Sequence, residues 1–504
     1  MWLLADSPGL FDAFAHLVNP AHPWPLILMM VGTALGIIVG AMPGLTGAML
    51  ITLALPLTFS MSNPADAMVL LVSMYVGSIS GGLITATVLR MPGTPASIMT
   101  TLDGYPLAQS GQPGRALGLG MTASFVGGVI SWVFLWLLAE PMADLSTQLA
   151  PFDLFALVLV ALALMSSVSG KSLTAGLLSG FLGILAAMPG QSPASGQLRL
   201  TFGIADLSDG LKLLPVLIGL FAVSQVIHEL TRRDQQVESI AVDRKGMLMS
   251  LSDLRRQAMN LIRSSLIGTW IGILPGIGAN IGSVVAYSAT KSLSNTPEEF
   301  GKGAESGIIA SESANNATVG GALIPLISIG IPGSVIDAIL LGALVIHGLQ
   351  PGPLLFNDNP DVVNIIVATT LISNIFMFVF MVLTVRWLAK LASIPRTFLL
   401  PTILVFCVVG AFAMGNRMFD VWVMLSFGVV GYFLERLKIP LAPFVIGFVL
   451  APIAEANLGA GLMLSGGSYW PLVTRRVSRV LFVVAVVTML VPFVSRMRQK
   501  SSPS

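Results

Sequence analysis

Long uninterrupted apolar runs follow one another along the whole chain, and the segment 154–165 (LFALVLVALALM) is representative of them. A helix needs about 20 such residues to cross a hydrocarbon core of about 30 Å. Because lipid offers the backbone no hydrogen-bonding partner, spanning segments fold as helices or closed barrels. Barrel strands alternate apolar and polar residues, and these runs do not. The runs therefore predict an all-α integral membrane protein, with the lipid bilayer as its surroundings.

Charged residues make up only 10% of the sequence, so we expect no sizeable soluble domain. About 10–12 segments are expected to cross the bilayer, with additional re-entrant or Pro-Gly-interrupted pieces. The candidate helices are 26–41, 45–60, 66–90, 116–139, 152–168, 173–188, 211–228, 261–289, 306–330, 334–349, 363–388, 398–414, 420–434, 440–455 and 480–495.

A basic linker divides the chain, and the positive-inside rule predicts that it is cytoplasmic. We expect a first transmembrane half at 1–230, the linker at 231–263 and a second half at 264–504. Within the linker, 250–263 is either an interfacial amphipathic helix with Ser252 or Asp253 as its cap, or an ordinary connecting helix. The basic side chains of the linker are Arg232, Arg233, Arg244, Lys245, Arg255, Arg256 and Arg263.

The two halves share an internal repeat. Segment 36–50 (GIIVGAMPGLTGAML) matches 268–282 (GTWIGILPGIGANIG) at an offset of 232 residues, and 75–95 matches 315–335 at an offset of 240. Each match contains a Pro-Gly pair. Secondary transporters are commonly built from two related, often inverted, repeats, so we expect inversion by analogy with that architecture.

Each Pro-Gly pair breaks a helix because Pro lacks an N–H group and Gly tolerates positive φ. Freed backbone groups persist in a membrane only where protein or trapped water satisfies them, so the four breaks are candidate binding sites. The alternative is that they are kinks or interfacial turns. The glycines and hydroxyl or amide groups at the breaks predict an anion site. The candidate substrate-binding residues are Gly44, Thr46, Gly47, Gly93, Thr94, Gly276, Gly278, Asn280, Gly333 and Ser334.

The most polar patch inside the second half is SESANNA (311–317). Glu312, Asn315 and Asn316 would share one helical face. Neutral oxygens with one carboxylate suit Na⁺, and a protonatable Glu suits H⁺, so this cluster is the candidate coupling-ion site. We expect carbonyls freed at Pro275-Gly276 to complete it. The alternative is that Glu312 marks an interfacial helix end.

Other polar residues are less informative. Asp337 has the position of a favourable charge at a helix N-terminus, and Asp103 has that of a turn residue. The single cysteine, Cys407, excludes an internal disulfide and a CxxC site. We expect no cofactor, no metal beyond a possible Na⁺ site and no nucleic-acid partner.

The chain resembles the large membrane subunit of tripartite tricarboxylate transporters (TctA type). The motifs that carry the resemblance are GAMPGLTG (40–47), PGTPASIMTTLDGYPLA (92–108), GILPGIGANIG (272–282), PEEFGKGAESGIIASESANNATVGGALIPLISIGIPGS (297–334) and GALVIHGLQPGPLLF (342–356).

This resemblance implies a multi-pass protein of the bacterial inner membrane, which imports a di- or tricarboxylate or related organic acid by cation symport. It also implies two partners, a small membrane subunit and a periplasmic solute-binding protein. The sequence departs from the family pattern at Arg90, where Asn is usual, and at Ser311, where Pro is usual. Arg90 either adds a cation near the site or extends to the interface.

Two other functional classes remain possible from the residues alone. A membrane-embedded enzyme would need a catalytic constellation, and the sequence shows no metal cluster or Ser-His pairing, so we expect no enzyme. A membrane channel would lack coupling to an ion gradient.

Overall fold

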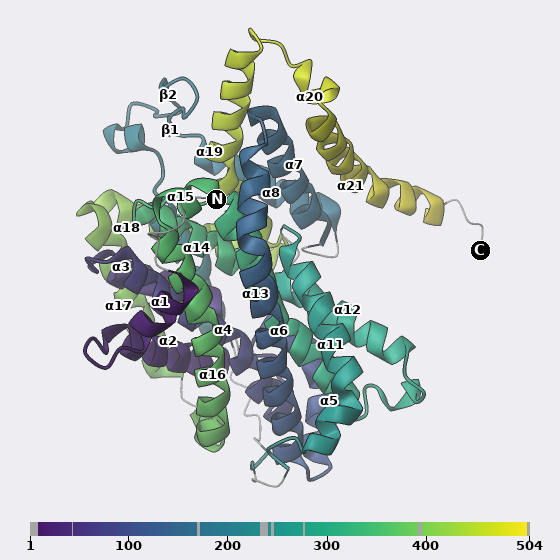
Figure 1. The fold of residues 1–504 in the computed structure, drawn as a ribbon. Coiled ribbons are helices and arrows are strands. Elements are labelled where there is room, and N and C mark those ends of the chain that lie inside the picture. The colour runs from purple at the N-terminus through teal and green to yellow at the C-terminus, as the bar shows by residue number, and fades with distance from the viewer. Residues whose placement is uncertain are drawn as a thin grey trace.

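The structure is a computed structural model that describes residues 9–42, 44–168, 172–231, 240–242, 246–275, 278–391 and 396–500 (Figure 1). This part of the chain is helical almost throughout, apart from one short antiparallel pair of strands, β1 (Gly190–Gln191) and β2 (Leu198–Arg199). The prediction of an all-α membrane protein is confirmed.

The helices of the first half, up to residue 231, include several short pieces between long spans. They are α1 (Leu10–Leu17), α2 (Trp24–Gly40), α3 (Gly47–Phe59), α4 (Pro64–Val88), α5 (Ile98–Gln109), α6 (Pro113–Thr147), α7 (Pro151–Val168), α8 (Leu173–Ala187), α9 (Leu213–Leu217) and α10 (Ser224–Thr231).

The second half has the same mixture of short and long helices. They are α11 (Leu251–Ile273), α12 (Gly278–Ser292), α13 (Glu305–Ile329), α14 (Val335–Ile346), α15 (Pro353–Asp358), α16 (Pro360–Leu391), α17 (Arg396–Gly415), α18 (Met418–Arg436), α19 (Leu441–Leu464), α20 (Pro471–Thr474) and α21 (Arg476–Lys500).

Six helical segments of the described chain are long and apolar enough to cross a membrane. Among the shorter apolar helices, α2 and α3 precede the first of these segments, and α8 and α14 lie between later ones. The segments of spanning length are α4, α6, α9 with α10 (Leu213–Thr231), α16, α18 and α19. The total number of crossings stays a prediction.

All four Pro-Gly elements lie between helices, as expected. α2 ends at Gly40 and α3 begins at Gly47, whereas α4 ends at Val88 and α5 begins at Ile98 after a turn of 3-10 helix. The same pattern returns between α11 and α12 and between α13 and α14. Pro43 and Gly276 themselves lie outside the described residues.

The stretch 250–263 is not a separate interfacial helix. It forms the first turns of α11, which continues without interruption to Ile273 because the apolar run carries it on into the bundle. The cap is Ser250 rather than Ser252 or Asp253. Its hydroxyl oxygen accepts a hydrogen bond from the backbone N–H of Asp253 at 3.1 Å.

The two repeat segments make equivalent helix crossings. A Cβ atom on Gly36 of α2 would lie 2.5 Å from the carbonyl oxygen of Met74 on α4. At the positions offset by 232 and 240 residues, a Cβ on Gly268 would lie 2.3 Å from the carbonyl oxygen of Ala314. Both distances are shorter than a carbon atom tolerates, so each crossing requires glycine.

The turns after α4 and α13 also require glycine at a close backbone contact. A Cβ on Gly93 would lie 2.2 Å from the carbonyl oxygen of Gly40, and one on Gly333 would lie 2.8 Å from that of Gly272. The two segments therefore share one local fold. The division into halves at residues 230 and 264, and the inversion of one half, stay predictions.

The helices of the two segments interleave. α13 of the second packs along α6 of the first, and α4 of the first packs along α16 of the second. At the periphery, α19 packs on α7 and α8. The C-terminal helix α21 packs on α7 and then extends away from the rest of the molecule (Figure 1).

Candidate functional site

The N-termini of two short helices frame the candidate site, and each is capped by a hydroxyl side chain. The hydroxyl oxygen of Thr46 accepts a hydrogen bond from the backbone N–H of Met49 at 3.2 Å, at the start of α3. At the start of α14, that of Ser334 accepts one from the N–H of Asp337 at 3.3 Å. A capping hydroxyl used in this way keeps its own hydrogen for a ligand.

One cavity of about 320 Å³ lies where the four breaks meet. Its walls also include Tyr75, Ser78 and Ile79 of α4, and the π-helical stretch Ile218–Val223 with the residues that follow it. π-Helical turns are rare and often occur at functional sites. The residues from the breaks that line this cavity are Thr46, Gly47, Thr94, Gly278 and Ser334.

A wider cavity of about 660 Å³ adjoins the first. The residues that line both are Thr46, Thr94, Pro95, Gln225, Glu435 and Leu441. We call the wider one the vestibule. Two cationic side chains, Arg90 and Lys438, line it. Other ionisable side chains of the vestibule are His228, Glu229 and Glu435.

Arg90 and Lys438 both have left-handed backbone conformations, with φ of 53° and 60°. Such conformations are uncommon for residues with a side chain, and they often occur at functional sites. The Arg90 guanidinium lies 5.7 Å from the ring centre of Tyr105. Arg90 therefore lies at the vestibule, and the two possibilities raised by the sequence stay predictions.

The structure brings together most, but not all, of the candidate substrate-binding residues. Gly44 and Gly93 line the vestibule. Gly333 lies behind the cavity wall, packed on the backbone of Gly272. Gly276 and the side chain of Asn280 lie outside the described part of the structure.

Gly44 combines two requirements for glycine. Its φ of 91° is rarely adopted by residues with a side chain. A Cβ at this position would also lie 2.3 Å from a carboxyl oxygen of Glu229. The break after α2 is therefore packed directly against α10.

Glu312 lies in the interior, with no exposed surface. Oε1 accepts a hydrogen bond from the hydroxyl of Thr100 on α5, and Oε2 accepts one from Ser124 of α6 at 3.2 Å. The carboxyl group is therefore held by two hydroxyl donors at the α13–α6 contact. The interpretation of Glu312 as an interfacial helix end is wrong.

The two asparagines of the cluster connect Glu312 to α4. Asn316 Oδ1 accepts a hydrogen bond from Ser80 at 2.6 Å, and its Nδ2 donates to the carbonyl oxygen of Glu312 at 3.2 Å. Asn315 Nδ2 donates to the carbonyl oxygen of Ile79, a cavity residue, at 3.4 Å, and its Oδ1 is buried without a hydrogen-bonding partner. The cluster thus lies one helix behind the cavity.

Asp103 is a structural residue that sequence reasoning misplaced. It is fully buried within α5 and not in a turn. Its Oδ1 accepts hydrogen bonds from the backbone N–H groups of Gly301, Gly303 and Ala304 at 2.8, 2.9 and 2.9 Å. The Tyr287 hydroxyl donates to Oδ2 at 2.8 Å. Asp103 therefore fixes the loop that leads into α13, and through α13 the position of Glu312.

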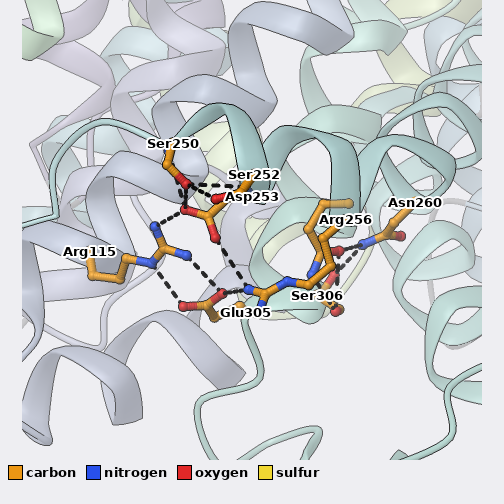
Figure 2. Close-up of polar contacts among 9 residues, drawn as sticks. Arg115, Ser250, Ser252, Asp253, Arg256, Asn260, Glu305 and Ser306 are labelled. Atoms are coloured by element: carbon orange, nitrogen blue, oxygen red, sulfur yellow. Dashed lines mark hydrogen bonds and ion pairs between the residues drawn. The ribbon is translucent and has the colours of Figure 1, made fainter.

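An ion-pair cluster ties the starts of α6, α11 and α13 together (Figure 2). Arg115 contacts Asp253 at 2.7 Å and Glu305 at 2.8 Å, and Arg256 contacts Glu305 at 3.1 Å. The Arg115 guanidinium holds the pKa of the Asp253 carboxyl well below its usual range. Because the pKa is lowered, this interaction stabilises the fold above the ordinary carboxyl pKa of about 4 and is lost only as the pH falls further.

The comparison with protein families agrees with this architecture. The model of the tripartite tricarboxylate transporter TctA family matches residues 26–446, which include all four breaks and the Glu312 cluster. The chain belongs to the TctA family. The resemblance inferred from its motifs is confirmed, and the protein is a transporter subunit with several membrane-spanning helices.

Two proteins of Agrobacterium vitis are similar to this TctA-family chain. The "Uncharacterized 52.8 kDa protein in TAR-I ttuC' 3'region" is 32% identical over 479 residues, which cover 95% of either chain. The "Uncharacterized protein in TAR-II ttuC' 3'region" is 33% identical over 233 residues, which are 46% of this chain and 96% of the relative. No solved structure matches the chain.

Proposed function

We propose that this TctA-family protein is the substrate-translocating subunit of a binding-protein-dependent secondary transporter. It imports a di- or tricarboxylate, or a related organic acid, by cation symport. The observation that carries the proposal is the cavity in which residues from all four helix breaks meet. Sites of this kind, between interrupted helices of two repeats, are where secondary transporters bind their substrates.

The cavity suits a carboxylate. The N-termini of α3 and α14 both reach it, and each helix N-terminus carries about half a positive charge. The hydroxyl groups of Thr46 and Ser334 can donate to carboxylate oxygens there. Arg90 and Lys438 in the adjoining vestibule offer two cationic side chains to an anion on its path, beside the carboxyl groups of Glu229 and Glu435.

The Glu312 cluster suits the driving cation. A buried carboxylate is costly unless a cation or hydrogen bonds offset its charge, and intramembrane acids commonly mark ion pathways. Asn315 and Asn316 offer the neutral oxygens that Na⁺ accepts. Carbonyl groups of the Pro275-Gly276 break are expected to complete the site, and Gly276 lies outside the described residues. The hydroxyl oxygens of Thr100, Ser124 and Ser80 are the further ligands that the structure supplies.

The partners are a small membrane subunit and a periplasmic solute-binding protein in a bacterial inner membrane. The name of the family denotes a tripartite system, which supports two additional components. The described residues form helices and one short hairpin, without a large domain outside the bundle that could capture scarce solute.

Reconstitution of the complex in proteoliposomes tests the function. We expect uptake of one member of a radiolabelled panel of citrate, succinate and tartrate, dependent on the binding protein and on a cation gradient. Full-rate uptake by this chain alone would contradict the dependence on a binding protein. Downhill flux that ignores every ion gradient would instead indicate a channel.

Variants of α13 test the coupling site in the same vesicles. Asn315→Ala should raise the Na⁺ concentration for half-maximal uptake about tenfold, the effect of losing about 1.4 kcal/mol of ligand binding. Ser313→Ala is the matched control, because that buried hydroxyl donates only to the carbonyl oxygen of Ile309 within its own helix. If the proton is the driving ion, Glu312→Gln alone should abolish coupling. Wild-type ion dependence in both Glu312→Gln and Asn315→Ala would refute the assignment.

A further inference from the structure

A second buried acid lies beside the cavity and has no place in the function proposed above. Asp337, in the first turn of α14, has no exposed surface, and neither of its carboxyl oxygens has a partner with full hydrogen-bonding geometry in the described protein. The hydroxyl groups of Ser334 and Tyr75 are its weaker, nearby contacts. Residues 334–336, immediately before it, line the cavity. By contrast, both oxygens of Glu312 accept hydrogen bonds.

The absence of partners decides the protonation form that this structure can hold. An ionised carboxylate without hydrogen bonds or a counter-charge costs several kcal/mol to bury, whereas the neutral acid costs much less. The N-terminus of α14 offsets only part of that cost, typically about 0.3–1 kcal/mol and up to about 2. Burial therefore favours a carboxylic acid at Asp337, and closer approach of a hydrogen-bond donor favours the carboxylate.

Two hydroxyl groups stand next to the carboxyl and could supply that partner. The hydroxyl groups of Tyr75 and Ser334 both interact with the Asp337 carboxyl group, and both residues line the cavity. Tyr75 is itself fully buried in α4. A substrate that displaces either hydroxyl would change the environment of the acid directly.

In the described elements that pack on α14, no other acidic or basic side chain is positioned to exchange a proton with Asp337. These elements are α3, α4, α9, α13 and α19. Their remaining titratable side chains are engaged elsewhere: Glu305 with Arg115, Glu455 with Arg199, Glu312 with Thr100 and Ser124, and Asp66 close to His16.

The internal repeat relates the two hydroxyl neighbours of Asp337 to polar residues of the other half, whereas Asp337 itself corresponds to Ser97. At the offset of 240 residues, Tyr75 corresponds to Asn315, and Ser334 corresponds to Thr94. Asn315 and Thr94 also carry buried oxygens without hydrogen-bonding partners. Corresponding positions of the two halves therefore both carry polar side chains. Asn315 lies near Glu312, and Tyr75 lies near Asp337.

We propose that Asp337 is a second ion site of the transporter, which binds a proton, and that Tyr75 and Ser334 couple it to the substrate cavity. The proton adds to the carboxylate oxygen when the site faces the outer aqueous phase. It leaves from the same oxygen after the site has changed its access. The Glu312 cluster and Asp337 then carry two cations in each cycle.

Infrared spectroscopy of the purified protein in D₂O tests the protonation without any substrate. The C=O stretch of a carboxylic acid is separate from the stretches of a carboxylate, and we expect an acid band in the wild type that grows as the pH is lowered from neutral. Asp337→Asn should remove one component of that band, and Glu312→Gln should leave that component in place. Tyr75→Phe keeps the acid and should shift its band, which provides a test if Asp337→Asn does not fold. An unchanged acid band in Asp337→Asn, or an unshifted one in Tyr75→Phe, would overturn the assignment.

Flux measurements on the reconstituted complex test the coupling. With Na⁺ equal on both sides, an imposed pH gradient should stimulate net uptake of the transported carboxylate among citrate, succinate and tartrate. Asp337→Asn should reduce this stimulation at least tenfold and leave substrate counterflow intact. Wild-type stimulation in Asp337→Asn would overturn a coupling role. If none of the three carboxylates were transported, the proposed function would be refuted. The infrared measurement tests the protonation of Asp337 independently of that outcome, because it uses no substrate.

Discussion

Single carboxyl groups at two buried positions organise the interior in different ways. Asp103 accepts four hydrogen bonds and fixes the loop 301–304, whereas Asp337 accepts none. Chain position alone assigns neither role, because the decisive partners of Asp103 lie about 200 residues away. The same residue type thus serves as an anchor at one site and as an exchangeable group at the other.

The anchoring role of Asp103 predicts a graded loss of stability. Asp103→Ala leaves buried N–H groups without an acceptor, at about 1–3 kcal/mol for each. Tyr287→Phe removes a single hydrogen bond and should cost about 1 kcal/mol. Thermal unfolding in detergent should therefore rank the wild type above Tyr287→Phe, and Tyr287→Phe well above Asp103→Ala. Equal unfolding temperatures for the two variants would show that the loop does not depend on Asp103.

At the scale of elements, close helix crossings through glycine position the four breaks. α2 and α4 approach so closely at Gly36 that no side chain fits, and α11 and α13 repeat the arrangement at Gly268. Close approach through small residues is the usual mode of helix association in membranes, where there is no hydrophobic driving force between helices.

Because the two crossings are equivalent, the same substitution at each should lower the stability of the protein by a similar amount. Gly36→Ala and Gly268→Ala each place a methyl group within 2.5 Å of a backbone carbonyl oxygen. We expect each to destabilise the protein by about 1–3 kcal/mol, measured by thermal unfolding. Gly9→Ala is the control, because its Cβ would come no closer than 3.7 Å to another group. A large effect at one crossing with none at the other would contradict the equivalence.

Local signals predicted most of the helices but not the contacts between them. The Pro-Gly pairs located the breaks because Pro and Gly act on the backbone at their own position. Helix α5 is missing from the predicted helices, because the pattern around Asp103 (LDGYP, 102–106) is typical of a turn. The α5 helix is held in place by tertiary hydrogen bonds, from Thr100 to α13 and from the loop before α13 to Asp103. Likewise, no local pattern indicates that Asp337 lacks a partner, because burial by α4 and α14 together creates that state.

At the scale of the whole molecule, α6 defines the two sides of the membrane. Its 35 residues span about 52 Å, more than the hydrocarbon core of about 30 Å. The ion-pair cluster at Arg115 lies at the end of α6 where α11 begins, within the basic linker 231–263. If the linker is cytoplasmic, this cluster is close to the cytoplasmic face, and the far end of α6 lies outside.

Cysteine labelling in intact cells checks this orientation. In a Cys407→Ala background, Gln148→Cys, just past the end of α6, should react with a membrane-impermeant maleimide added from outside. Ser239→Cys in the linker should react only after the membrane is permeabilised. Labelling of Ser239→Cys from outside, with Gln148→Cys protected, would reverse the topology.

The interleaving of α13 with α6, and of α4 with α16, also constrains how the protein is made. Translation delivers α4 and α6 long before α13 and α16 leave the ribosome. Until then, Ser80 and Ser124 lack the partners that they have in the mature fold. The nascent first half is therefore inserted with polar groups and glycine-lined helix surfaces that its later partners have not yet covered. Incompletely packed chains of this kind are exposed to proteases. We therefore expect synthesis that stalls between the two halves to yield a fragment that is degraded rather than half a transporter.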